Sequence, residues 1–380
     1  MSAPSIPNLL TMRGGAHGRG GRAPGRDRGG DGPGRNGISG SHAGPNQDAT
    51  IQGTDSDAAV SRLSAVELGY LSDPYAHLFV HGPPTRRQPI INRGTYTRST
   101  SIDILVDRFL TSTPDDEPRQ IISLGAGTDT RCLRVFTSPK KHRNVLYHEI
   151  DFPTVMAAKQ SLLTSNPTLQ ALLSAPTQIS ATVSQCKSLV DPAHHNTLTL
   201  HGLDLRTITP TSAPLPTLIP SAPTLLLSEC CLCYLPAATS TALLSHFTSL
   251  LPLLGIIIYE PVHPGDAFGK TMVANLAARG IEMPTLEVYP TPADQETRLR
   301  GAGFDEVRSR TVDQIWEGWT TPAERERVDA LEGGLDEIEE WRLLAGHYVV
   351  AWGWRGGTPK DGDDDWGGWE AEGGPQGSSA

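Results

Sequence analysis

The chain has 380 residues, 37% of them hydrophobic, and a formal net charge of -10 at pH 7. This length suits one catalytic domain with tails and a sizeable core. The negative charge argues against nucleic acid as the main partner of the folded part. No apolar run is long enough to cross a bilayer, and no apolar signal core opens the chain. Five cysteines, three of them at Cys230, Cys231 and Cys233, do not suggest a disulfide framework, so a reducing, cytoplasmic setting is expected.

Both ends of the chain have compositions typical of disorder. Residues 1–57 are rich in Gly, Arg, Ser and Pro, and residues 356–380 are Gly-rich and acidic. Repeats such as Arg13-Gly14-Gly15 resemble segments that bind RNA loosely, although a solvated tail with weak affinity is the simpler interpretation. We expect residues 58–355 to form the folded domain, with surface insertions near 165–197 and 207–223.

A glycine turn follows the first expected strand. Helical spacing of apolar residues predicts helices over 61–71 and 97–110, and residues 121–124 read as a buried strand. Gly125-Ala126-Gly127 then allows a tight turn and close approach of the backbone to a ligand. In α/β proteins a nucleotide-like ligand is met at this carboxyl end of the first parallel strand.

The remaining strands alternate with helices. Strands are expected at 145–151, 198–205, 224–229, 255–260, 306–312 and 347–352, and helices at 237–251, 264–279, 294–301 and 322–344. The last of these helices is acidic and reads as a solvated amphipathic helix. Asp151 ends the second strand, near the spacing at which an acidic residue accepts ribose hydroxyls, although it also suits a helix N-cap. Glu229 ends the fourth strand and points into the expected ligand crevice.

Several ordered motifs together resemble the leucine carboxyl methyltransferase family, from roughly residue 60 to residue 355. The motifs are Gly69-Tyr70, Asp73-Pro74-Tyr75, Asn92 through Arg98, Leu124 through Thr130, Glu149 through Pro153, Asp204-Leu205-Arg206 and Ser228 through Tyr234. The resemblance implies a class I methyltransferase fold with a mostly parallel seven-stranded sheet, helices on both faces and an N-terminal helical cap. It also implies S-adenosylmethionine as the methyl donor.

By this resemblance, two arginines of the cap contact the cofactor. Arg98 would hold its carboxylate end, because a bidentate guanidinium–carboxylate pair fixes position and orientation. Arg62 stands where the family usually carries a lysine, which keeps the charge but changes the geometry.

The other implied site residues follow the strands. Gly125 forms the cofactor turn, Asp151 takes the ribose hydroxyls, and Glu229 faces the cofactor. Asp204 and the Leu205 backbone would reach the exocyclic amine and a ring nitrogen of adenine. Tyr234 would position the substrate carboxylate, and Arg98 and Tyr234 together would be the catalytic residues. These last assignments depend on the resemblance.

The implied substrate is the C-terminal leucine of the protein phosphatase 2A catalytic subunit, and a monomeric enzyme is expected. A terminal carboxylate, with a pKa of about 3.3–3.7, is already ionised at neutral pH. Methyl transfer to it needs no general base, only desolvation and alignment. The lack of a Ser-His-Asp set or Cys-His pair is therefore expected under this hypothesis.

Other functions remain open at this point. One is a carboxyl or O-methyltransferase for a small molecule or a modified tRNA base, although tRNA-modifying relatives carry a large extra C-terminal domain. A second is a non-catalytic RNA-associated protein led by its Arg-Gly tail. A third is an NAD-dependent oxidoreductase, which Thr130 and the lack of a Tyr-x-x-x-Lys pair weaken. The cysteine cluster has no second Cys/His pair at zinc-ligand spacing, so packing is its simpler role.

Overall fold

The computed structural model describes residues 45–112, 116–179 and 186–356. Its strands are β1 (Arg119–Leu124), β2 (Val145–Asp151), β3 (Thr177–Gln178), β4 (Cys186–Asp191), β5 (Asn196–Gly202), β6 (Thr224–Glu229), β7 (Leu254–Pro261), β8 (Glu306–Thr311) and β9 (Tyr348–Arg355). Its α-helices are α1 (Pro45–Glu67), α2 (Pro89–Ser112), α3 (Arg131–Phe136), α4 (Pro153–Ser165), α5 (Pro167–Gln170), α6 (Ala237–Leu250), α7 (Ala267–Ala277), α8 (Pro284–Val288), α9 (Pro292–Gly301), α10 (Val312–Trp319), α11 (Pro322–Asp329) and α12 (Ile338–Gly346). Short 3-10 helices are η1 (Ala76–Phe79), η2 (Leu205–Thr207), η3 (Leu232–Tyr234) and η4 (Leu331–Gly333).

One sheet runs through the middle of the molecule, in the order β3-β4-β5-β2-β1-β6-β7-β9-β8. Strands β5, β2, β1, β6 and β7 are parallel, and β9 is antiparallel to both β7 and β8. All residues of β1 and β7 are buried, as expected for strands covered on both faces. The predicted α/β fold around a central parallel sheet is confirmed, and the sheet is larger than the seven strands expected.

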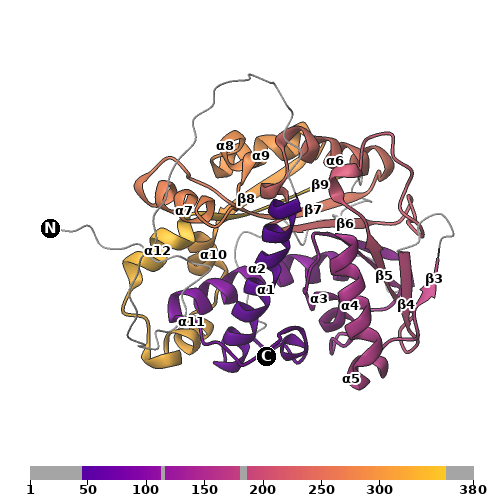
Figure 1. The fold of residues 1–380 in the computed structure, drawn as a ribbon, viewed down its shortest axis with the longest axis horizontal. Coiled ribbons are helices and arrows are strands. Elements are labelled where there is room, and N and C mark those ends of the chain that lie inside the picture. The colour runs from indigo at the N-terminus through magenta and orange to yellow at the C-terminus, as the bar shows by residue number, and fades with distance from the viewer. Residues whose placement is uncertain (1–44, 113–115, 180–185, 357–380) are drawn as a thin grey trace, which may run out of the picture.

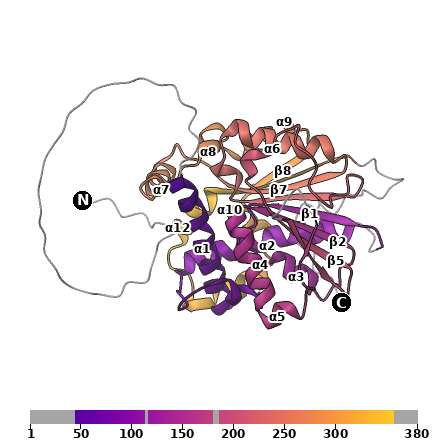
Figure 2. The same cartoon turned by 45° about the vertical axis from the view of Figure 1, so that its right-hand side comes forward.

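Helices cover both faces of the sheet. In Figures 1 and 2, α6 and α9 lie on one side of the strands, and α3 and α4 lie on the other. Two apolar clusters match these layers. Ile122, Leu226 and Phe247 belong to the cluster under α6, whereas Ile121, Leu225 and Phe136 belong to the cluster on the side of α3. Neighbouring residues of one strand therefore serve opposite layers, which is the period-2 pattern of a pleated strand.

The two added strands lie in a segment that was expected to be a surface insertion. Within 165–197, β4 pairs antiparallel with β5, and the short β3 pairs with β4 at the sheet edge. Leu189 of β4 is fully buried, although its neighbours along the strand are polar or partly exposed. Apolar residues are too sparse here for a strand to be recognised from the sequence.

The cap is larger than expected at both of its helices. Helix α1 begins at Pro45, so residues 45–57, expected in the disordered tail, are helical, while residues 1–44 and 357–380 lie outside the described residues. Helix α2 begins at Pro89 and buries polar residues in its first turns. Ser64 of α1 donates a hydrogen bond to Asn92 of α2 (2.9 Å), which joins the two helices. Arg62 lies in α1 and Arg98 in α2, as the predicted cap requires.

The C-terminal helix predicted over 322–344 is divided. Gly333 and Gly334 both have positive φ, at 85° and 101°, and separate α11 from α12. The segment also packs on α2 instead of lying in solvent: Tyr96 donates to Glu324 (2.9 Å), and the Arg93 guanidinium lies over the Trp341 ring, 5.6 Å from its centroid. The motif around Arg93 therefore holds the cap to the C-terminal helices.

Among residues 45–112, 116–179 and 186–356, no helix is both long enough and apolar enough to cross a bilayer.

Candidate active site

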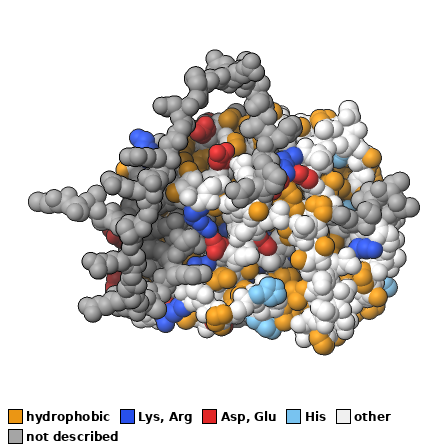
Figure 3. All heavy atoms as spheres, in the orientation of Figure 1, with side chains coloured by type: hydrophobic (Ala, Val, Ile, Leu, Met, Phe, Trp, Pro, Cys, Tyr) orange, Lys and Arg blue, Asp and Glu red, His pale blue; other side chains and the backbone are white. Residues whose placement is uncertain are grey.

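A cavity of about 570 Å³ opens at the carboxyl ends of the central parallel strands. Leu124 of β1 lies beside Ile150 of β2 and Ser228 of β6, so these three strands end together. Helix α1 runs over this edge of the sheet. On the face of the molecule shown in Figure 3, basic and acidic side chains gather near the middle of that face. The cavity is lined by all eight residues that the sequence predicted for the site: Arg62, Arg98, Gly125, Asp151, Asp204, Leu205, Glu229 and Tyr234.

The glycine turn after β1 lies against both the sheet and the cap. Gly125 has φ 64°, and a Cβ there would lie 2.5 Å from the Cys231 Sγ. Gly127 has φ 45°, and its Cβ would collide with the Asp55 carboxylate. Positive φ and these close approaches both require glycine. The turn is therefore fixed between the β6 edge and α1.

Asp151 is held in place by the backbone of that turn. Its carboxylate accepts hydrogen bonds from the Gly127 N–H (2.8 Å) and the Phe152 N–H (2.7 Å). Burial raises the pKa of Asp151 to about 6, and the two N–H donors oppose this rise. The side chain is mostly ionised at neutral pH and keeps lone pairs for hydroxyl donors in the cavity.

A chain of ion pairs crosses one end of the cavity. Arg62 contacts Asp129 (3.3 Å), Asp129 contacts Arg131 (2.5 Å), and Arg131 contacts Glu229 (3.2 Å). Glu229 then accepts a hydrogen bond from Arg98. Arg131 is the centre of this chain and only 1% of its side chain is exposed. Two arginines, Arg62 and Arg98, thus end the chain at the cavity wall.

The carboxylates of this chain are kept ionised by the arginines. Burial by itself would raise the pKa of Glu229, but Arg98 and Arg131 outweigh it and hold that pKa below its usual range. The same opposition, with Arg131 and Arg62 as the cations, holds the pKa of Asp129 well below the ordinary value. The cavity therefore has fixed charges of both signs.

Asp204 and Leu205 follow the end of β5. Asp204 caps the short helix η2, and Leu205 is the first residue of that helix. The Asp204 carboxylate accepts from the Arg206 guanidinium, with Nη2 at 2.7 Å from Oδ2. Arg206 also binds both oxygens of Asp48 in α1 at 2.8 Å. The predicted adenine contact of Asp204 must therefore use lone pairs that Arg206 leaves free. Asp48 was missed because it lies in the segment that was expected to be a disordered tail.

Tyr234 follows the cysteine cluster, in η3. Its hydroxyl lies 4.0 Å from the Cys230 Sγ, and burial raises the pKa of the Tyr234 phenol, so it is a neutral hydrogen-bonding group. Among the described residues no cluster of His, Cys, Asp and Glu could hold a metal ion. All five cysteines are free thiols.

Three residues that hold the cavity wall were not predicted from the sequence: Asp55, Asp129 and Arg131. Asp129 and Arg131 were within the recognised Gly-turn motif, and their spacing of two residues lets one side chain bind the other. Asp55 accepts from the Thr128 N–H (2.8 Å), but its place in a polar segment gave no signal.

A buried acid behind the site makes stability depend on pH. Burial raises the pKa of Glu260 in β7 from 4.5 to about 8, and Arg298, 4.0 Å away, opposes this only in part. Between these values the folded protein binds a proton that the unfolded chain has lost, so stability falls as pH rises through this window. We expect Glu260→Gln to flatten that fall, by up to about 1.4 kcal/mol per pH unit.

Urea unfolding of both proteins at several pH values between about 5 and 8 checks this. Glu306→Gln, at an exposed position, is the matched control and should leave the slope unchanged. Parallel curves for wild type and Glu260→Gln would contradict the protonated state of Glu260.

Comparison with known proteins assigns the chain to a family. The model of the family described as leucine carboxyl methyltransferase matches residues 50–248. A protein named leucine carboxyl methyltransferase 1 from Aspergillus fumigatus is 45% identical, over 95% of this chain and 96% of its own length. The protein of the same name from Emericella nidulans is 46% identical over 95% and 96%, and that from Yarrowia lipolytica is 39% identical over 80% and 97%. The chain therefore belongs to the leucine carboxyl methyltransferase family and is a methyltransferase enzyme.

Proposed function

We propose that this protein transfers the methyl group of S-adenosylmethionine to the α-carboxylate of the C-terminal leucine of the protein phosphatase 2A catalytic subunit. The product is a methyl ester. Family membership supports carboxyl methylation that depends on S-adenosylmethionine. The named protein substrate is the finer part of the proposal, and the experiment below is directed at it.

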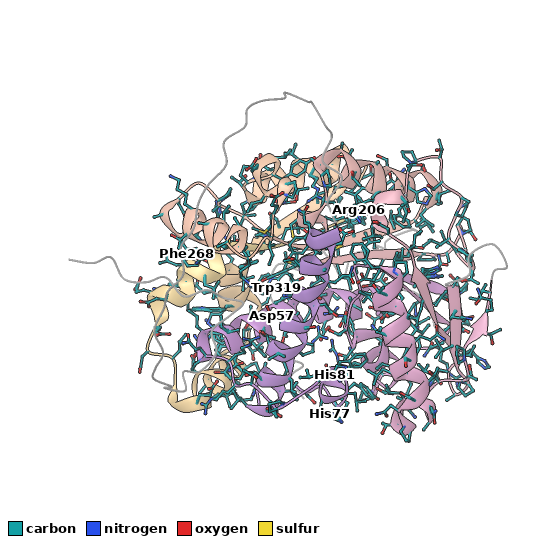
Figure 4. The ribbon with its side chains drawn as sticks, viewed as in Figure 1. Asp57, His77, His81, Arg206, Phe268 and Trp319 are labelled. Atoms are coloured by element: carbon teal, nitrogen blue, oxygen red, sulfur yellow. The ribbon has the colours of Figure 1, made fainter. Side chains whose placement is uncertain are left out.

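The cavity has the length and order of charges that a nucleoside joined to an amino acid requires. Along α1, Asp48 meets Arg206, Asp55 meets Thr128, and Arg62 meets Asp129. Residues 48 and 62 are about 21 Å apart along a helix that rises 1.5 Å per residue. In Figure 4, Arg206 lies beside the upper end of α1 and Asp57 lies about halfway down it. The cavity is thus elongated under α1.

The two ends of the cavity differ in the groups they offer. At the Arg62 end, Arg98 and Arg62 suit the carboxylate of the amino-acid part, because arginine binds carboxylates with paired N–H donors. At the glycine turn, Asp151 suits ribose hydroxyls, and Asp204 with Leu205 suits the adenine edge at the other end. The volume of about 570 Å³ lies within the usual range for small-molecule sites.

The chemistry asks for alignment and not for proton transfer. When bound, S-adenosylmethionine supplies an electrophilic methyl group on a positively charged sulfur. The acceptor carboxylate is already ionised, with a pKa of about 3.3–3.7, so no residue has to remove a proton. Arg98 is fixed by Glu229 and by its position 4.6 Å from the centroid of the Tyr259 ring. The neutral Tyr234 hydroxyl lines the same cavity and would orient the acceptor oxygen.

The test combines the purified protein, S-adenosylmethionine labelled in its methyl group, and the purified phosphatase 2A catalytic subunit. We expect base-labile label on the subunit, because methyl esters hydrolyse in base. A matched subunit that lacks only its final leucine should take up no label.

Two other outcomes would redirect the proposal. If the protein binds the cofactor but labels neither subunit, the phosphatase is excluded, and a small-molecule or tRNA-base acceptor takes its place. If the protein binds no cofactor at all, the assignment of the cavity is wrong. We propose further that the enzyme works as a monomer in the cytoplasm, where its free thiols stay reduced.

A further inference from the structure

Two cysteines meet at the inner wall of the cavity, directly after the glutamate that ends β6. The Cys230 Sγ lies 3.9 Å from the Cys233 Sγ. Cys230 lines the cavity and is partly exposed, whereas Cys233 is fully buried behind it in η3. The two thiols are therefore neighbours, but only one of them can be reached from the cavity.

The surroundings make the two thiols chemically unequal. The Cys233 thiol, as a hydrogen-bond donor, lowers the pKa of Cys230 to about 7; burial opposes this, and the Arg98 charge adds to it. Burial raises the pKa of Cys233 well above its ordinary value. At neutral pH about half of Cys230 is therefore thiolate, the nucleophilic form of cysteine, whereas Cys233 keeps its proton.

The other three cysteines lack this combination. Burial raises the pKa values of Cys132, Cys186 and Cys231. Cys132 and Cys186 are also buried away from the cavity. Among the five cysteines, Cys230 alone joins exposure to the cavity with a near neighbour thiol and a lowered pKa.

We propose that Cys230 and Cys233 form an oxidisable thiol pair, in which Cys230 is the site that reacts with peroxides and Cys233 closes a disulfide with it. The geometry carries this assignment: Cys230 lines the cavity, and the buried Cys233 sulfur lies 3.9 Å from it. Cys231 also lines the cavity and is partly exposed, but Cys233 pairs with the Cys230 sulfur.

The reaction balances in two steps. The Cys230 thiolate attacks one oxygen of a peroxide, the O–O bond breaks, and the sulfur loses two electrons to become a sulfenic acid, while the other oxygen leaves and takes a proton from water. The Cys233 sulfur then attacks the Cys230 sulfur. The S–S bond forms, the S–O bond breaks, and the leaving hydroxide takes the Cys233 proton as water. A dithiol reductant converts the Cys230–Cys233 disulfide back to two thiols.

The disulfide changes the wall of the active site. Its sulfurs are separated by about 2.05 Å, so the 3.9 Å contact must close by almost half. Glu229 and Tyr234 flank this segment in the chain, and both line the cavity. Oxidation therefore shifts the cavity wall beside Arg98, and we expect methyl transfer to fall on oxidation and return on reduction.

The experiment treats the full-length protein with hydrogen peroxide, blocks the remaining thiols by alkylation, and maps the cysteine peptides by mass. We expect the peptide with all three neighbouring cysteines to lose two hydrogen atoms and to carry one alkyl group, on Cys231. Saturating S-adenosylhomocysteine should slow this oxidation, because it fills the cavity that exposes Cys230. The readout needs no methyl acceptor, so it can succeed or fail independently of the proposed substrate.

Variants distinguish the roles. In Cys233→Ala, a sulfenic acid should persist on Cys230 and react with a dimedone probe, whereas Cys230→Ala should give neither disulfide nor probe adduct. Cys231→Ser is the matched control and should still form the disulfide. A disulfide that includes Cys231, or equal probe labelling of Cys233→Ala and Cys230→Ala, would overturn the proposal. So would a wild-type peptide that keeps three alkylated cysteines after peroxide oxidises other residues.

Discussion

Replacing Arg98 with alanine is expected to weaken S-adenosylmethionine binding by about 100-fold, which corresponds to about 3 kcal/mol. Arg98 faces the cavity and is the partner that the carboxylate end of the ligand would meet. The fold should survive, because Glu229 keeps its contact with Arg131 (3.2 Å) after Arg98 is removed. Isothermal calorimetry gives the dissociation constant, and thermal unfolding of the free variant checks the fold.

Two further variants make this result specific. Asp151→Ala should also weaken binding, through the ribose hydroxyls and not the carboxylate. Arg308→Ala removes an arginine from an exposed ion pair with Glu306 (3.1 Å) and should leave binding unchanged. Unchanged dissociation constants in both Arg98→Ala and Asp151→Ala would refute the assignment of the cavity to this ligand.

Arg131→Met is expected to lower the free energy of unfolding by about 3–5 kcal/mol at neutral pH. Its guanidinium is almost fully buried and contacts three carboxylates: Asp129 (2.5 Å), Asp103 (2.7 Å) and Glu229 (3.2 Å). Without it, buried negative charges lose their main partner. Urea unfolding at neutral pH measures the loss.

The pH dependence identifies the cause of that loss. Arginine partners, against the effect of burial, hold the pKa values of Asp103, Asp129 and Glu229 below their ordinary values. The stability from these carboxylates is present above their unfolded pKa values and disappears as pH falls through the folded ones. The difference between wild type and Arg131→Met should therefore shrink below about pH 4. A constant difference, or a loss no larger than in the exposed control Arg308→Met, would show that charge is not the cause.

The sheet could be predicted where each strand was a continuous apolar run. The strand expected over 224–229 coincides with β6, and the one expected over 255–260 lies within β7. In helix α2, which buries polar residues, the apolar pattern failed. The first turns of α2 bury Asn92, Arg93 and Thr97, so their apolar spacing is hidden until partners from α1 and the C-terminal helices are known.

The site was predictable as far as its residues follow strand ends. Gly125, Asp151 and Glu229 come directly after or at the end of parallel strands, and topology alone brings them together. Asp48 and Asp55 lie in a helix with weak apolar spacing, and their partners are 158 and 73 residues away in the chain. Such long-range polar pairs leave no local pattern in the sequence. For this reason the first helix of the cap was predicted to begin too late in the chain.

The attachment of α1 has a consequence for the effect of ionic strength. Arg206–Asp48 and Arg279–Asp57 tie this helix to the rest of the protein, both at 2.8 Å, and each side chain is about one quarter exposed. Ions reach such pairs, and the screening length falls from about 10 Å at 0.1 M to about 3 Å at 1 M salt. The central sheet is held by apolar contacts that salt does not weaken. Concentrated salt should thus loosen the roof of the cavity while the sheet beneath it stays folded.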